Sequence, residues 1–406
     1  MQAFMKTWVA ACQSGGNAKM VIPAGTFLTS QLTFTGPCKG RVAVEVQGTV
    51  KAHTDISGYP SPEWLNFEDI NGLEVSGSGT FDGQGPQVWA LNDCKKNSDC
   101  QMLPTSLKFS HVTNGKLRGI SSLNSMAFHI GINNCLNFEV SSVKITAPAE
   151  SPNTDGVHIS SSTNVVVTKS VIGTGDDCVS FGQGTFNVSI TDIVCGPGHG
   201  ISIGSLGKYE QEKDVSGITV RNCTLKDTDN GVRIKTYQGS DPSKATHMVF
   251  ENIKLINVKN PLIIDQLYCD RGCTKSPSKV AISDVKFRNI KGTSSTENAV
   301  SIICSSSVPC ANVELTDIDI QMVGNKPTTS ECTNAKVLFK GAQKPLTKMS
   351  KDGSNSTILV FTQKRLLRKQ LRSYLEYGSL FISTGLVVVA RNEWIATGLA
   401  VVVGRK

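Results

Sequence analysis

Long helical patterns, long apolar runs and aromatic side chains are all scarce in this 406-residue chain, of which aromatic residues make up 6%. No segment between its short apolar stretches keeps a sustained 3.6-residue period, which disfavours layers of alternating strands and helices. The apolar runs are also too short and too interrupted to span a bilayer, so no membrane partner is expected. The sequence therefore predicts an all-β fold.

Most of the chain also lacks an excess of positive charge, although its formal net charge is +8. Residues 341–406 hold 11 of the 41 basic and 3 of the 33 acidic residues, which leaves 30 of each in residues 1–340. We therefore expect no nucleic-acid partner. The basic stretch breaks the strand-and-turn rhythm of the rest, and we predict that residues 346–406 are an aberrant tail outside a domain that spans residues 1–345.

We also expect no signal peptide in this sequence, because Met1 directly precedes a segment that already has a structural pattern. Residues 2–12 have apolar positions at Phe4, Trp8 and Ala11, which predicts a helix. A helix at this place can cover the open end of a stack of strands, which needs a cap. The N-terminus of the domain is expected to be truncated.

Short β-branched strands recur along the chain, and Gly, Asn, Asp or Ser bounds most of them. Three consecutive strands begin at Val157, Val179 and Ile201, at intervals of 22 and 22 residues, and later intervals lengthen to about 30–38 residues. A repeat of this length predicts a parallel β-helix with about three strands per coil, in which inward side chains fill the core.

Polar residues occupy the same place before each of these three strands. Asp155, Asp177 and His199 lie two residues before Val157, Val179 and Ile201. Asp and Gly are ordinary turn residues, so either acidic turn alone is typical of any β-helix. Two acids and a histidine in matching register indicate instead that consecutive coils build one site.

The residue types in this column suit the acid–base cleavage of a glycosidic bond, which needs one protonated carboxyl and one carboxylate. Asp176 and Asp177, with Asp155 one coil away, place three carboxyls close together, so the pKa of one should rise. Arg233 and Lys235 alternate with apolar residues in the next strand and should both point outward. Two cations beside three acids predict a substrate that carries its own carboxylates.

Thirteen cysteines suggest disulfides in an extracellular protein, whereas the six histidines do not cluster with them as a zinc site requires. Four pairs lie close in sequence and are candidates for disulfides: Cys94 with Cys100, Cys178 with Cys195, Cys269 with Cys273, and Cys304 with Cys310. The odd count leaves at least one thiol unpaired, with Cys332 the candidate. Asn187 and Asn222 are acceptors in glycosylation motifs, which also favours secretion.

At its acidic and basic motifs the chain resembles the polygalacturonases, glycoside hydrolases that cleave the homogalacturonan of pectin. The segments that carry the resemblance follow in order as Asn153-Thr154-Asp155, Gly175-Asp176-Asp177, Gly198-His199-Gly200 and Arg233-Ile234-Lys235. The resemblance runs from about Phe4 to Lys344. It implies a right-handed, single-stranded parallel β-helix and hydrolysis with inversion, without metal or cofactor, by a secreted cell-wall glycoprotein that acts on pectin as a monomer.

The resemblance also implies a role for each site residue. Asp176 corresponds to the general acid, Asp155 and Asp177 to the residues that hold and deprotonate the attacking water, and His199 to the residue that supports the protonation of the acid. Arg233 and Lys235 correspond to the residues that bind the substrate carboxylate. Tyr268 matches a tyrosine near the sugar on the reducing side, and Asn153 is predicted to bind substrate with them.

Several stretches are most similar to plant exopolygalacturonases, including pollen forms, which release galacturonic acid from the non-reducing end. These stretches are residues 196–207, 292–296 and 332–336. Exo action requires one end of the cleft to be blocked, and endo action remains an alternative. The residue pattern also admits a pectate lyase on the same fold, which needs a carboxylate cluster for calcium and a basic proton acceptor, or an inactive wall-binding remnant.

Overall fold

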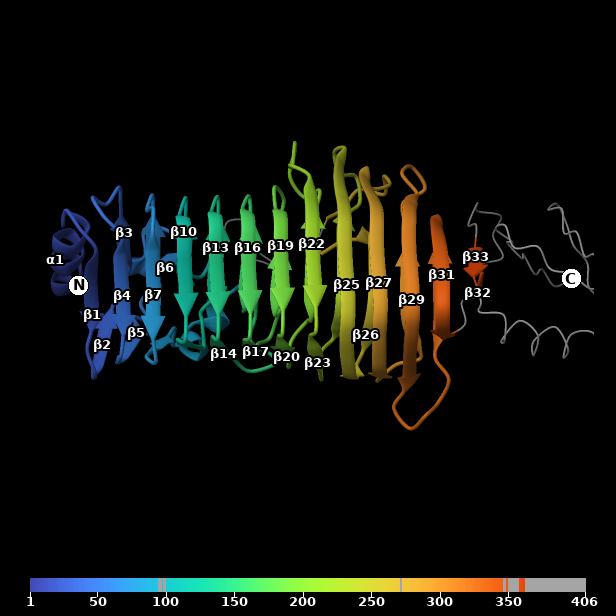
Figure 1. Cartoon of the computed structure of the whole chain (residues 1–406), viewed down its shortest axis with the longest axis horizontal. Helices are drawn as coiled ribbons and strands as arrows, with labels where there is room; N and C mark the ends of the chain where they lie inside the picture. The colour runs from blue at the N-terminus through green and yellow to red at the C-terminus, as the bar shows by residue number, and fades with distance from the viewer. Residues whose placement is uncertain (94–96, 98–99, 271, 346–347, 350–357, 362–406) are drawn as a thin grey trace, which may run out of the picture.

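Short strands climb along one long axis, and each pairs in parallel with the equivalent strand of the next coil (Figure 1). The computed structural model describes residues 1–93, 97, 100–270, 272–345, 348–349 and 358–361. The predicted parallel β-helix is confirmed. A helix, α1 (Gln2–Cys12), lies at the N-terminal end of the stack.

The strands fall into three stacks. The first contains β1 (Ala18–Ile22), β4 (Val42–Val46), β7 (Leu73–Gly77), β10 (Thr113–Arg118), β13 (Leu136–Ser141), β16 (Thr163–Thr168), β19 (Phe186–Thr191), β22 (Val215–Arg221), β25 (Ser243–Val258), β27 (Val280–Ser294), β29 (Cys310–Met322), β31 (Ala335–Lys344) and β33 (Ile358–Phe361). The second contains β2 (Thr26–Thr29), β5 (Thr49–Ala52), β8 (Thr80–Asp82), β11 (Ser121–Leu123), β14 (Lys144–Thr146), β17 (Val171–Gly173), β20 (Val194–Cys195) and β23 (Thr224–Lys226).

The third stack forms a separate 12-stranded sheet. It contains β3 (Leu32–Thr35), β6 (Glu63–Glu68), β9 (Thr105–Ser110), β12 (Ile130–Asn133), β15 (Val157–Ser160), β18 (Val179–Phe181), β21 (Ile201–Leu206), β24 (Asn230–Tyr237), β26 (Asn260–Tyr268), β28 (Asn298–Ile303), β30 (Thr329–Thr333) and β32 (Lys348–Met349). Three short 3₁₀ helices lie in the connections of the early coils: η1 (Ile56–Gly58), η2 (Gly85–Gln87) and η3 (Trp89–Leu91).

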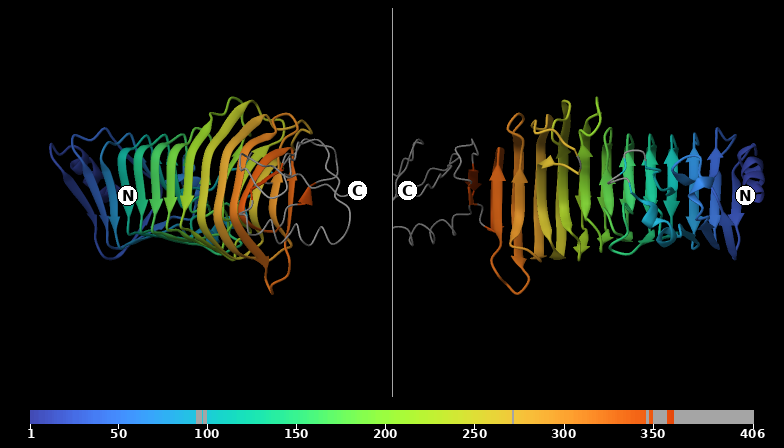
Figure 2. Two further views of the ribbon diagram at one scale, coloured as in Figure 1. Left: turned by 45° about the vertical axis from the view of Figure 1, so that its right-hand side comes forward. Right: turned by 180° about the vertical axis from the view of Figure 1, so that it is seen from behind.

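The number of strands per coil changes along the solenoid. Coils up to β24 have the predicted three strands, but β25 pairs with both β22 and β23. From there the first and second stacks continue as one long strand per coil, and Figure 2 shows these long strands curving around the molecule. The expectation of about three strands per coil therefore holds for the early coils, and the later coils have two.

Parallel pairing continues past residue 345. Lys348–Met349 pairs with β30, and Ile358–Phe361 pairs with β31. The rest of the predicted tail over residues 346–406 lies outside the described residues. The domain boundary at residue 345 stays a prediction.

The predicted N-terminal cap is present as α1, which has the predicted bounds of residues 2–12. Its Trp8 is buried, and the ring centroid lies 5.2 Å from that of Phe34 and 6.1 Å from that of Phe67. The indole nitrogen of Trp8 donates a hydrogen bond to the carbonyl oxygen of Thr35 at 3.1 Å. The helix therefore covers the apolar interior of the first coil. No helix among the described residues is long and apolar enough to cross a membrane.

Aromatic side chains at equivalent inward positions stack on one another in the core. Phe34, Phe67 and Phe109 share a register, with ring centroids 4.8 Å and 5.3 Å apart, and Phe138 lies 4.7 Å from Phe109. All four are buried. Inward positions that repeat along a solenoid place the same side-chain type in each coil, so that the core becomes a continuous column.

An asparagine ladder follows one turn of the solenoid on its outside. Each Nδ2 donates to the Oδ1 of the preceding coil, from Asn114 to Asn71, Asn137 to Asn114, Asn164 to Asn137 and Asn187 to Asn164, at 2.6–3.1 Å. The last four have φ between +52° and +57°. Asn tolerates this left-handed conformation better than most residues, and its amide then bonds to the neighbouring coil.

Three of the predicted disulfides are confirmed: Cys178–Cys195, Cys269–Cys273 and Cys304–Cys310. Cys94, from the fourth predicted pair, lies outside the described residues. A disulfide that the sequence analysis did not identify, Cys12–Cys38, joins the end of α1 to the first coil. Cys332 is unpaired as predicted, and Cys135 and Cys223 are also free and buried in the described part of the chain.

The aromatic column predicts a large difference between buried and exposed phenylalanines. Phe109→Ala should lower the free energy of unfolding by about 3–5 kcal/mol, because Phe109 is fully buried between two rings. Phe186→Ala removes a ring that is 37% exposed and should cost about 0.5 kcal/mol or less. Urea denaturation followed by circular dichroism measures both, and equal losses would contradict a role for the column in stability.

Candidate active site

The acidic turns and the histidine turn precede adjacent strands of the third stack. Val157 pairs with Val179, and Val179 pairs with Ile201, so the predicted register is confirmed. Backbone bonds join the turns themselves, since the N–H of His199 donates to the carbonyl oxygen of Asp176 at 2.8 Å. Gly200 has a φ of +86°, and a Cβ there would overlap the carbonyl oxygen of Asn230. The tight turn after His199 therefore requires glycine.

Each of two aspartates in the column accepts a short hydrogen bond from a serine of the next coil. The hydroxyl of Ser180 donates to Oδ2 of Asp155 at 2.6 Å, and that of Ser202 donates to Oδ1 of Asp177 at 2.6 Å. Both carboxyls are buried, with exposed fractions of 6% for Asp155 and 2% for Asp177. The repeat of the fold thus produces the same acid–serine pair twice.

The two predicted cations lie beside these acids, and both contact Asp177. Nη2 of Arg233 lies 3.0 Å from Oδ1 of Asp177, and Nζ of Lys235 lies 3.1 Å from Oδ2. Val232 and Ile234 are buried in the core, which confirms that the cations point outward on one face. In this structure the positive charge is therefore directed at Asp177, so an incoming carboxylate would share the cations with it.

Asp176 points to a more open place and pairs with His199. Its Oδ1 lies 3.0 Å from Nδ1 of His199, and its Oδ2 accepts from Nδ2 of Asn153 at 3.4 Å. The side chain of Asp176 is 18% exposed and that of His199 is 36% exposed. On its other side Nε2 of His199 lies 3.6 Å from a carboxylate oxygen of Asp229. Of the three carboxyls, Asp176 is the one that a molecule on the surface can reach most easily.

The expected rise in one carboxyl pKa is found, but on Asp155. Burial, and then the charges of Asp176 and Asp177, raise the pKa of Asp155 well above its ordinary value. For Asp176, burial raises the pKa, but the hydrogen bond and charge of His199 and the charge of Lys235 outweigh it and lower the pKa. The hydrogen bond with Asp176 raises the pKa of His199 in turn. In the absence of substrate, the proton of this pair therefore resides on His199.

Tyr268 lies next to Lys235, and its predicted place near the sugar on the reducing side stays a prediction. Its ring centroid is 5.4 Å from Nζ of Lys235 and 5.3 Å from the ring of Tyr237, which it meets edge to face. Nζ of Lys208 lies 5.5 Å from the centroid of Tyr237. An aromatic face attracts a cation that lies over it. These contacts therefore hold Lys235 and Lys208 at this side of the site.

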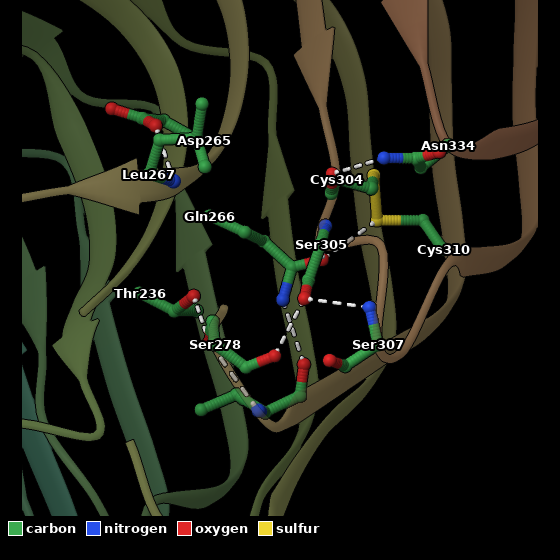
Figure 3. Close-up of a disulfide and its surroundings, with 11 residues drawn as sticks. Thr236, Asp265, Gln266, Leu267, Ser278, Cys304, Ser305, Ser307, Cys310 and Asn334 are labelled. Atoms are coloured by element: carbon green, nitrogen blue, oxygen red, sulfur yellow. Dashed lines mark hydrogen bonds between the residues drawn. A yellow bond between two sulfur atoms is a disulfide. The ribbon is translucent and has the colours of Figure 1, made fainter. Parts of the chain in front are cut away.

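A buried polar network supports the strand end that carries Tyr268 (Figure 3). Gln266 is fully buried, its Nε2 donates to the carbonyl oxygen of Val280 at 2.8 Å, and its Oε1 accepts from the N–H of Ser305 at 3.0 Å. Ser305 directly follows Cys304 and lies inside the loop that the Cys304–Cys310 disulfide closes. A buried amide whose two ends are both bonded fixes the backbone around it, and here that backbone positions Asp265 and Tyr268.

Several residues that contact the predicted ones were not identified from the sequence. They are Asn92, Ser180, Ser202, Tyr237 and Asp229, and His158 in turn bonds to Ser180. Successive strands of the third stack place four residues in one register. His158 pairs with Ser180, Ser180 with Ser202, and Ser202 with Arg233. The register that placed Arg233 could therefore have identified the two serines and His158. Asn92, whose Nδ2 donates to Oδ1 of Asn153 at 3.1 Å, comes from an irregular connection that carries no such signal.

One group among the described residues has the residue types and spacing of a metal site. Asp176, Asp177 and His199 place one possible ligand atom each within 4.8 Å of one another. However, both oxygens of Asp177 contact cations, and Nδ1 of His199 contacts Asp176. Arg233 and Lys235 would oppose a bound cation, so these residues fit a metal poorly.

A family model and several curated proteins match most of this chain, and they belong to one kind of enzyme. The model of the Glycosyl hydrolases family 28 matches residues 12–344. Exopolygalacturonase clone GBGE184 of Arabidopsis thaliana is 50% identical over 350 residues, which cover 84% of this chain and 82% of that protein. An exopolygalacturonase of Zea mays is 46% identical over 350 residues, 85% of each chain.

Solved structures show the same fold. Endo-xylogalacturonan hydrolase from Aspergillus tubingensis superposes with a TM-score of 0.73 at 22% identity, covering 88% of this chain and 95% of that one. A hyperthermoactive exopolygalacturonase from Thermotoga maritima gives a TM-score of 0.70 at 17% identity, covering 86% and 87%. At these identities the likeness concerns the fold.

The different surroundings of Asp155 and Asp177 predict opposite effects on stability. Because the folded-state pKa of Asp155 is raised, its ionisation costs stability, and this cost grows as the pH rises through that pKa. Asp155→Asn should therefore be more stable than the wild type at neutral pH, with the difference shrinking in acid. Asp177→Asn removes the partner of the buried Lys235 and the partly buried Arg233 and should destabilise by about 3 kcal/mol.

Urea denaturation between acid and neutral pH measures both variants. If Asp155→Asn were destabilising at neutral pH, the ionised Asp155 would be favourably placed in the fold and the predicted sign would be wrong.

Proposed function

Because the chain belongs to the Glycosyl hydrolases family 28, we propose that it hydrolyses the α-1,4-galacturonosyl bonds of homogalacturonan with inversion and releases galacturonate from the non-reducing end. The chain is a glycoside hydrolase. Relatives of 45–50% identity that carry the name exopolygalacturonase support the exo mode. The observation that carries the proposal is the convergence of three carboxyls, a histidine and two cations on one face of the third stack.

Asp176 is the general acid in this proposal. It is the most exposed of the three carboxyls, and His199 keeps a proton beside it. When a sugar covers the pair and excludes water, a charged pair becomes less favourable than a neutral one, and the proton can move from His199 to Asp176. Asp176 then protonates the leaving glycosidic oxygen. Because the pKa of Asp176 is low, the carboxyl carries no proton of its own near neutral pH, and His199 supplies the proton.

Asp155 and Asp177 hold the attacking water and accept its proton. The raised pKa of Asp155 makes it the stronger base of the site once it is ionised. Asp177 is held by Ser202 and two cations, which favours its role as a fixed hydrogen-bond acceptor for the water. An inverting reaction requires a water on the side of the sugar ring opposite to the acid.

The remaining residues bind the sugar. Arg233 and Lys235 attract its carboxylate, and Arg233 can bind it through two nitrogens. Tyr268 lies against Lys235 and offers an aromatic face to the sugar on the reducing side. Asn153 contacts the sugar at the acid in this proposal, which its exposure and its hydrogen bond to Asp176 support.

Polygalacturonate is the proposed partner, and the cell wall after secretion is the proposed location. The relatives are plant exopolygalacturonases, and the described chain has four disulfides, which persist in oxidising compartments. We assign the hydrolase to residues 1–345, acting as a monomer. A lyase on the same fold is less well supported, because Arg233 and Lys235, its candidate proton acceptors, are both engaged with Asp177.

Purified protein incubated with polygalacturonate should release monogalacturonate as the sole early product. Asp176→Asn should lower kcat about 10²–10⁴-fold, since it removes the proton donor, while polygalacturonate binding is retained. Asp69→Asn is the matched control, because Asp69 is exposed and has a φ of +56°, a conformation that Asn adopts readily. The control should keep wild-type turnover.

Each competing function gives a different result. Mixed oligomers at early times would indicate endo action, and unsaturated products with loss of activity in chelator would indicate a lyase. Binding without release of reducing sugar would indicate a wall-binding remnant. Unchanged turnover in Asp176→Asn would refute the role given to Asp176.

A further inference from the structure

Hydrogen bonds join the side chains of Asp155, Ser180 and His158 into a chain that leads away from the carboxyl along the third stack. The hydroxyl of Ser180 lies 2.6 Å from Oδ2 of Asp155 and 2.8 Å from Nδ1 of His158. His158 and Ser180 face each other because their strands pair in register. His158 has no hydrogen bond to Asp176 or to the cations, so its hydrogen-bonded connection to the site runs through Ser180.

The number of protons shared by Asp155, Ser180 and His158 determines which ring nitrogen of His158 is protonated. A serine hydroxyl has one proton, and when Asp155 is ionised that proton must point at the carboxylate. The oxygen of Ser180 can then only accept from Nδ1 of His158. Ionised Asp155 therefore requires His158 to carry a proton on Nδ1. In a neutral imidazole this is the tautomer with a bare Nε2.

The surroundings of His158 keep it neutral. Its ring stacks on Phe128 with centroids 4.8 Å apart. Burial lowers its pKa to about 4, against a smaller opposing effect of Asp177 and with a further lowering by Lys235. Asp176, Asp177 and Lys235 are the charged groups that act on Asp155 from the neighbouring coils. His158 therefore contributes a fixed N–H donor to the chain and no charge at neutral pH.

Two other serines show what is specific to this arrangement. Ser202 occupies the equivalent place beside Asp177, but Nε of Arg233 donates to it at 3.1 Å. Ser122 pairs with Nδ1 of His129 at 2.8 Å, as Ser180 does with His158, and both residues are buried. The structure gives Ser122 no hydrogen bond to a carboxylate. Only Ser180 joins a histidine to a carboxyl of the site within the described residues.

We propose that His158 is a positioning residue for hydrolysis: its Nδ1–H holds the hydroxyl proton of Ser180 on Asp155 and so favours the ionised carboxylate that accepts the proton of the attacking water. This inference rests on the proposed function, in which Asp155 is part of the base. Without the donor, Ser180 is free to rotate away, and the pKa of Asp155 rises further because this hydrogen bond no longer lowers it.

Variants at position 158 separate the donor from the shape of the ring. His158→Leu removes the N–H, whereas His158→Asn keeps an N–H at the place of Nδ1. The acidic limb of the pH profile of kcat/KM reports the base in the free enzyme. It should move to higher pH by about one unit in His158→Leu and in Ser180→Ala, and stay near the wild-type position in His158→Asn.

Ser122→Ala is the matched control, because it breaks a serine–histidine bond of the same length in which the serine donates to no carboxylate, although the backbone N–H of His129 bonds to the carbonyl oxygen of Asp155. Its acidic limb should stay in place. The double variant His158→Leu with Ser180→Ala should shift no further than either single variant, because both break the same chain. Circular dichroism melts identify any variant that fails to fold, and Ser180→Ala then tests the chain alone. An acidic limb that does not move in His158→Leu would overturn the proposal.

A second measurement does not depend on turnover. Nitrogen-15 NMR of protein labelled at its histidines gives the tautomer of each ring, and the signals of His158 are those that His158→Asn lacks. We expect a protonated Nδ1 and a bare Nε2 near neutral pH, and a bare Nδ1 would overturn the proposal. If the wild type proves inactive on polygalacturonate, the proposed function fails, and the tautomer still decides whether this chain of hydrogen bonds exists.

Discussion

The parallel register of the third stack is the constraint on which the site depends. Val157, Val179 and Ile201 pair across adjacent coils, and this pairing alone brings residues 22 positions apart to within hydrogen-bond distance. A slip of one residue would turn every inward side chain outward, so the buried core fixes the register. The aromatic column in the earlier coils and the cap by Trp8 stabilise the same stacking. The chemistry of the site is therefore a consequence of the core.

Within that frame the fold gives similar residues different environments. Asp155 and Asp177 each accept from a serine one coil away, but two cations contact only Asp177, while Asp155 is buried beside other carboxyls. Asp176 lies at the open surface with His199. In the proposed function these three environments suit three roles: a proton donor supplied by a histidine, a fixed acceptor and a base with a raised pKa. Separation of pKa values among neighbouring acids is what acid–base catalysis requires.

Much of this could be predicted from sequence, because the signals are periodic. The 22-residue interval predicted the column, alternation predicted that Arg233 and Lys235 point outward, and short spacing predicted three disulfides. Contacts between residues that lie far apart in the sequence leave no periodic pattern from which they could be predicted. The pairing of both cations with Asp177, the Cys12–Cys38 disulfide and the fusion of two stacks at β25 depend on three-dimensional packing. The raised pKa fell on Asp155 because burial, which sequence does not give, outweighs its hydrogen bond.

A crystal structure with bound galacturonate tests the central claim most directly. We expect the sugar over the third stack, with its carboxylate on Arg233 and Lys235. Its anomeric carbon should lie between Asp176 on one side and Asp155 with Asp177 on the other. A sugar bound on another face of the solenoid, with these residues unchanged and uncovered, would contradict it.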